Sequence, residues 1–234
     1  MNRRPIRDAD GATVGTLYLP PETSADGVLV IASHGHSADH DFLEHERHRQ
    51  DLELWLAQGW HVATHRQGGE ASWGNAQALE GAREAYTAAA ALTPVRRVVA
   101  FGFSMGGLAS LNIAAHRVLP DLLGVVTVNG VVDTHTFTPE HGVWEAYGAS
   151  SWDDLAERQS GSDPARDDPQ RLAGIPILQL AGRADLSVEP ARHTEVLAAR
   201  AATPELLTTV LGAWGHVDGP FSPELIVAWI RARL

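Results

Sequence analysis

Ser104 lies in a G-x-S-x-G motif that spans residues 102–106, between an apolar, β-branched run and a helix-like stretch. A serine on a sharp strand-to-helix turn projects its Oγ clear of its own backbone, and glycines on both sides allow the chain to approach closely. The free N–H groups of the helix that follows would point to where an oxyanion forms. The motif therefore predicts a nucleophile for attack on a carbonyl carbon, although alone it also fits an ordinary glycine-rich turn.

Two later residues have the chemistry that a serine nucleophile needs, and each follows a strand-like run. Serine is a weak nucleophile at neutral pH, so His216 would take its proton as a general base. The resulting imidazolium needs a fixed anion, which Asp185 would supply. Asp133 also follows a strand-like run and is the alternative acid, but the motif context favours Asp185.

The chain order Ser104, Asp185, His216 resembles that of α/β-hydrolases, and the resemblance covers nearly the whole chain. It identifies the chain as similar to a compact serine esterase of that superfamily. A haloalkane dehalogenase or an epoxide hydrolase would need aspartate where Ser104 stands. The resemblance implies a carboxylesterase-like hydrolase that forms an acyl-enzyme on Ser104. An acyltransferase, a peptidase or amidase with the same three residues, and a non-catalytic binding protein on this fold are the alternatives.

The resemblance also implies two backbone N–H groups that would stabilise an oxyanion. One belongs to Met105, which follows the serine. The other is expected from the loop at residues 34–37, with His36 as the donor and Ser37 as the alternative. The family often carries a second glycine in this loop, and here the sequence continues as Ser-Ala-Asp-His instead.

Apolar runs alternate with helix-like stretches along the chain, which predicts βαβ units in an α/β fold. The expected strands are 14–19, 27–33, 60–64, 97–103, 124–131, 176–181 and 206–211. The expected helices are 41–58, 76–92, 105–118, 190–201 and one that begins at Pro223. We expect a mostly parallel twisted sheet with helices on both faces in a single domain, residues 1–234. Ligands of such sheets bind outside the carboxyl ends of the strands, where the loops carry the residues above.

Residues 133–174 break this alternation, being acidic and turn-rich, and are expected to form a small cap or an irregular insertion within the domain. The aromatic residues of this segment would either line the substrate site or pack within the segment itself. Trp73, His135 and Trp144 are the expected substrate-binding residues. Aromatic walls favour an acyl or aryl ester of modest size as the substrate.

Composition excludes several other functions. The chain of 234 residues has a formal net charge of −11, which argues against nucleic acid and anionic membranes as partners. There are no cysteines, and Met1 to Asp10 has no apolar segment of a signal peptide, so a cytoplasmic location is expected. A histidine-rich run at residues 34–48 has ligands that zinc would accept, but we expect no metal and no cofactor. Instead, His45 and His48 are expected on the polar side of a helix. The sequence leaves the oligomeric state open.

Overall fold

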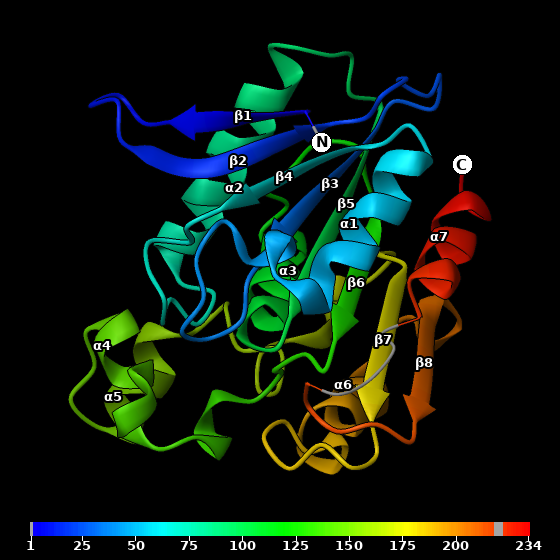
Figure 1. The fold of residues 1–234 in the computed structure, drawn as a ribbon. Coiled ribbons are helices and arrows are strands. Elements are labelled where there is room, and N and C mark those ends of the chain that lie inside the picture. Colours follow the sequence, from blue (N-terminus) through cyan, green and yellow to red (C-terminus); the bar gives the residue numbers. More distant parts are fainter. Residues whose placement is uncertain (1, 218–221) are drawn as a thin grey trace.

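An eight-stranded sheet in the order β1-β2-β4-β3-β5-β6-β7-β8 forms the centre of the protein (Figure 1). The structure is a computed structural model that describes residues 2–217 and 222–234. The strands are β1 (Asn2–Arg7), β2 (Thr13–Leu19), β3 (Val28–Ser33), β4 (His61–His65), β5 (Arg97–Phe103), β6 (Leu122–Val128), β7 (Ile177–Gly182) and β8 (Leu207–Gly212). β2 pairs antiparallel with both β1 and β4, and all pairs from β4 through β8 are parallel. The predicted mostly parallel sheet is confirmed.

β1 is the strand that sequence reasoning missed. The first expected strand, at residues 14–19, corresponds to β2, but β1 precedes it, pairs with it along its length and forms the edge of the sheet. β1 contains three arginines and a proline, and only Ile6 is buried. It therefore lacks the apolar alternation by which a half-buried strand is recognised.

Helices cover both faces of the sheet, as expected (Figure 1). One face is covered by α1 (Glu46–Ala57) and α7 (Pro223–Arg231), and the other by α2 (Ala76–Ala90), α3 (Met105–Ala115) and α6 (Thr194–Arg200). Along β5 the side chains alternate between two apolar clusters: Val99 and Phe101 face α1 and α7, while Val98 and Ala100 face α2 and α3. Both faces of the central strand are therefore buried, as a parallel sheet requires.

Two predicted helices are broken by an irregular residue. The segment 41–58 begins with a 3-10 turn, Phe42–Glu44, and α1 starts only after His45, whose backbone is extended. The segment 190–201 contains a 3-10 turn and then α6, with a break at His193. By contrast, Asn75 caps α2 as its type predicts, because its side chain accepts from the amides of Gln77 and Ala78.

The segment 133–174 lies beyond the sheet and contains the short helices α4 (Val143–Tyr147) and α5 (Trp152–Arg158) (Figure 1). A third apolar cluster joins it to the start of α3, where Met105 and Leu108 pack with Val143 and Leu155. We refer to residues 133–174 as the cap segment. Within the described ranges, no helix has the length and apolar character needed to cross a bilayer.

Candidate active site

Ser104 occupies a strained turn between β5 and α3. Its backbone has φ 54° and ψ −121°, an unfavourable conformation for a residue with a side chain. A Cβ added to Gly102 would lie 2.0 Å from the carbonyl oxygen of Gly106, and one added to Gly106 would lie 2.1 Å from that of Ser33. Both glycines of the G-x-S-x-G motif are therefore required by close backbone contacts.

Ser104, His216 and Asp185 form one hydrogen-bonded chain. The Oγ of Ser104 is 3.1 Å from Nε2 of His216, and Nδ1 of His216 is 2.7 Å from Oδ2 of Asp185. Because a carboxylate only accepts hydrogen bonds, Nδ1 carries the proton and Nε2 is free to accept from the serine hydroxyl. The structure thus brings together three residues that are far apart in the sequence.

The Asp185 carboxylate is fully buried and is oriented by its own loop. Its Oδ1 accepts hydrogen bonds from the amides of Ser187 and Val188, both at 2.8 Å. These two bonds leave Oδ2 directed at His216. The negative charge is therefore held in place by neutral groups and by the imidazole.

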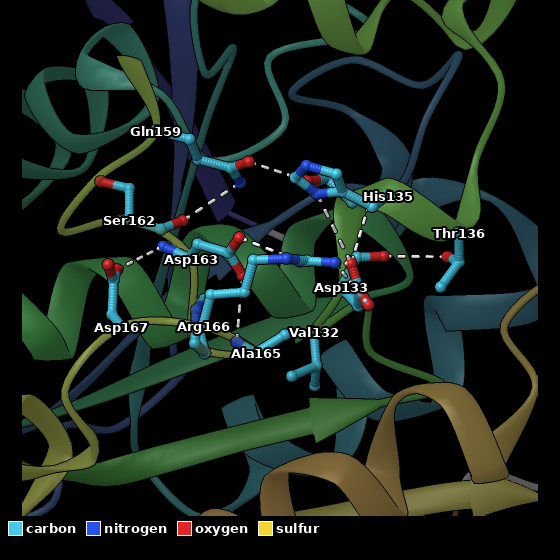
Figure 2. A network of polar contacts seen from close by, with 12 residues as sticks. Val132, Asp133, His135, Thr136, Gln159, Ser162, Asp163, Ala165, Arg166 and Asp167 are labelled. Atoms are coloured by element: carbon cyan, nitrogen blue, oxygen red, sulfur yellow. Dashed lines mark hydrogen bonds and ion pairs between the residues drawn. The ribbon is translucent and has the colours of Figure 1, made fainter. Parts of the chain in front are cut away.

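Asp133, the alternative acid, lies in a different network (Figure 2). Its two carboxylate oxygens accept from Nη1 and Nη2 of Arg166 at 2.7 and 3.2 Å, and Oδ1 also accepts from the amide of His135. Burial alone would raise the pKa of the Asp133 carboxyl, but the hydrogen bonds and charge of Arg166 and the His135 amide together lower it. The carboxylate in contact with His216 is that of Asp185.

The loop that is expected to supply an oxyanion donor lies against Ser104. A Cβ added to Gly35 would be 3.3 Å from the Cβ of Ser104. The amide of Ser37 donates to the carbonyl oxygen of Glu70 at 2.9 Å and is therefore already used. In the part of the chain that the structure describes, the amides of His36 and Met105 donate to no backbone carbonyl. This arrangement favours His36 over Ser37.

Solved structures resemble this chain along its whole length. A protein from Thermus thermophilus, TT1662, aligns with TM-score 0.70 and 20% identity over 99% of this chain and 98% of its own. The esterase domain of a Rhodothermus marinus protein aligns with TM-score 0.67 and 18% identity over 99% and 98%. A puromycin-hydrolyzing peptidase from Mycobacterium tuberculosis aligns with TM-score 0.71 and 18% identity over 99% of this chain and 38% of its own. The chain has the α/β-hydrolase fold. A scan against protein-family models and a search of curated proteins found no match.

Of the expected substrate-binding residues, His135 and Trp144 lie in the cap segment and Trp73 lies beside it. Trp73 is 1% exposed, and its Nε1 donates to the carbonyl oxygen of His141, to which Nε2 of His36 also lies close, at 3.1 Å. Trp73 therefore joins the loop of His36 to the cap segment. The rings of His135 and Trp144 pack against Trp152, with centroids 5.0 and 5.5 Å away.

A groove of about 600 Å³ lies next to the turn that carries Ser104, and the sequence did not predict it. Its lining residues are Gly35, His36, Ala38, Phe42, His45, Glu46, Arg47, His48, Phe103 and Val217. Phe103 precedes the serine, and its ring centroid is 5.2 Å from that of His216. Through Phe103 the groove therefore lies beside Ser104 and His216.

The expectation that His48 lies on the polar side of its helix is wrong. His48 is 5% exposed, and its ring lies 5.3 Å from that of Phe42 and 4.9 Å from that of Phe103. Its spacing from the buried residues Leu52 and Trp55, four and seven positions later, was the signal that places it on the apolar face. Across residues 2–217 and 222–234, the histidines and acidic residues form no group of three that could hold a metal ion.

Proposed function

We propose that this protein is a serine hydrolase that cleaves carboxylic esters through an acyl-enzyme on Ser104. The observation that carries the proposal is the unbroken chain from Oγ of Ser104 through both nitrogens of His216 to Asp185, at 3.1 and 2.7 Å. An arrangement of nucleophile, base and orienting carboxylate is the recurring device for acyl transfer on unrelated folds.

In the proposed reaction, Nε2 of His216 takes the hydroxyl proton as Oγ of Ser104 bonds to the substrate carbonyl carbon. The carbonyl oxygen becomes an oxyanion, which accepts hydrogen bonds from the amides of Met105 and His36. The imidazolium, stabilised by Asp185, then gives its proton to the leaving alcohol oxygen as the carbon–oxygen bond breaks. Water repeats the same steps on the acyl-enzyme and releases the carboxylic acid.

Two observations favour ester hydrolysis over the alternatives. The esterase domain from Rhodothermus marinus aligns along 98% of its length, whereas the peptidase aligns along only 38% of its own. The groove beside Ser104 has an exposed rim that includes His36 and Val217, the latter 44% exposed. A groove open to solvent next to Ser104 supports hydrolysis over acyl transfer, because acyl transfer requires that water be kept away from the acyl-enzyme. A binding protein has no need for the strained serine.

The test is Ser104→Ala, assayed with p-nitrophenyl esters of increasing acyl length and with a fluorophosphonate label. We expect kcat/KM to fall by about a thousandfold or more and labelling to disappear, because the three residues work as a unit. Ser110→Ala is the matched control, since Ser110 is a buried serine on α3, the helix that follows Ser104. Its rates are expected to equal those of the wild type. Equal rates for Ser104→Ala and the wild type would refute the proposal.

A further inference from the structure

Asn129 stands directly after β6, in a position that no step of the proposed reaction uses. Asn129 is 1% exposed, and its backbone has φ 45°, in the left-handed region that asparagine and glycine tolerate best. A buried side chain in a strained backbone persists only where surrounding contacts hold it. The contacts of Asn129 therefore indicate what it does.

The side-chain amide of Asn129 connects the end of β7 to the loop that carries His216. Its Nδ2 donates to the carbonyl oxygens of His216 at 2.8 Å and of Gly215 at 3.1 Å. Its Oδ1 accepts from the amide of Gly182 at 2.9 Å, three residues before Asp185. These bonds fix the backbone of His216 relative to β7, the strand that leads to Asp185.

The residues next to Asn129 hold the nucleophile. The amide of Ser104 donates to the carbonyl oxygen of Val128 at 3.0 Å, and the amide of Val131 donates to the carbonyl oxygen of Ser104 at 2.9 Å. A Cβ added to Gly107 would lie 2.5 Å from the Cα of Gly130, so α3 also begins in close contact with this turn. One four-residue turn, 128–131, is therefore the common support of the serine and the histidine.

We propose that Asn129 is a positioning residue for the reaction proposed above, on which this inference rests. Its two donated hydrogen bonds keep the His216 backbone where Nε2 can reach Oγ of Ser104. A misplacement of about 1 Å in reacting groups costs about 10²-fold in rate, so even a small displacement of this loop has a large effect. The substitution Asn129→Gly keeps the left-handed backbone and removes all three side-chain hydrogen bonds, including the two to the His216 loop.

The first measurement is the kinetics of Asn129→Gly per titrated active site. We expect kcat to fall by about 10- to 100-fold with KM within about threefold of the wild type, because the change acts on the base rather than on substrate binding. In a His216→Ala background, Asn129→Gly should produce no further loss of the residual activity. An equal loss in both backgrounds, or an unchanged kcat, would overturn the inference.

Asn112→Ala is the matched control. Asn112 is another buried asparagine whose Nδ2 donates to two carbonyl oxygens, those of Gly74 and Ser162, on the far side of α3. It should lower the midpoint of thermal unfolding with kcat unchanged. If it lowers kcat as much as Asn129→Gly does, the effect is one of general stability and the inference is wrong.

Hydrogen–deuterium exchange separates failure of this inference from failure of the proposed function. If the wild type hydrolyses no ester and takes no fluorophosphonate label, the proposed function fails. Asn129→Gly should still raise exchange at residues 212–217 and leave the C-terminal half of α3 unchanged. Asn129→Asp, which keeps the shape but turns an oxygen toward the two carbonyls, provides a second variant with the same expectation. Unchanged exchange at 212–217 in both variants would overturn the inference.

Discussion

Two aspartates follow the neighbouring parallel strands β6 and β7, and they differ in the groups that hold their carboxylates and in their exposure. The carboxylate of Asp185 is held by two backbone amides and has one oxygen left for His216. The carboxylate of Asp133 is held by the guanidinium of Arg166, which occupies both oxygens. The Asp185 carboxylate is 0% exposed, against 18% for Asp133.

The kind of partner separates the two roles. Amides are neutral, so the charge of Asp185 remains available to stabilise an imidazolium at His216. The charge of Asp133 is already balanced by Arg166, which lies later in the cap segment and binds Asp163 as well. Asp133 therefore anchors the cap segment at the end of β6, and the proposed reaction does not need it.

The largest effect that tests this comparison is expected from Asp185→Asn. An asparagine amide presented to Nδ1 of His216 favours the wrong tautomer, so Nε2 can no longer accept the proton of Ser104. We expect kcat to fall by about 10³- to 10⁴-fold, measured on the p-nitrophenyl ester that the wild type cleaves best. Asp133→Asn is the paired control, and its kcat should stay within about threefold of the wild type. A greater loss in Asp133→Asn would reverse the comparison.

Much of the fold could be predicted because it follows from local patterns. Buried parallel strands are continuous apolar runs in the sequence. The loop at the carboxyl end of each strand is therefore the segment that directly follows such a run. The glycines around Ser104 mark a backbone contact that only glycine permits, and for this reason the turn could be predicted from the sequence. The chain order of the serine, the acid and the histidine then pointed to one edge of the sheet.

The features that were missed depend on which loops meet in space. Asn129 is an ordinary asparagine after a strand until the loop of His216 is placed beside it. The groove beside Phe103 exists only because the loop at residues 34–38 and the start of α1 face Val217. The sequence favoured Asp185 over Asp133, but the pairing of Asp133 with Arg166 was missed, because no periodicity gives the position of Arg166 in an irregular segment.

A smaller effect, on stability, is expected from Asp133→Asn. Removing the charge-assisted bonds to Arg166 should lower the free energy of unfolding by about 1–3 kcal/mol. Urea unfolding at pH 7 measures this difference. Asp154→Asn is the matched control, because Asp154 pairs with Arg158 one turn later on the same helix, α5, and such i,i+4 ion pairs contribute little. If the two variants lose equal free energy of unfolding, the bonds between Asp133 and Arg166 contribute no more than a surface ion pair does.

The smallest effect is the pH dependence of that stability difference. The pKa of Asp133 is lower in the folded protein than in the unfolded chain, where it is about 3.9. A carboxyl with a lowered pKa stabilises the fold fully above its unfolded pKa, and this contribution is lost as the pH falls through the folded pKa. The difference between the wild type and Asp133→Asn should therefore be constant from pH 7 to about pH 5 and shrink below about pH 4. Burial raises the pKa of Asp163, which acts in the opposite direction, and the charge of Asp133 raises it further. The burial effect is present in both proteins and cancels, so only the contribution of the Asp133 charge to the pKa of Asp163 differs between them. Urea unfolding at pH 7, 5.5, 4.5 and 3.5 would decide this, and a difference that grows toward low pH would contradict the assignment of Asp133 as the charged partner of Arg166.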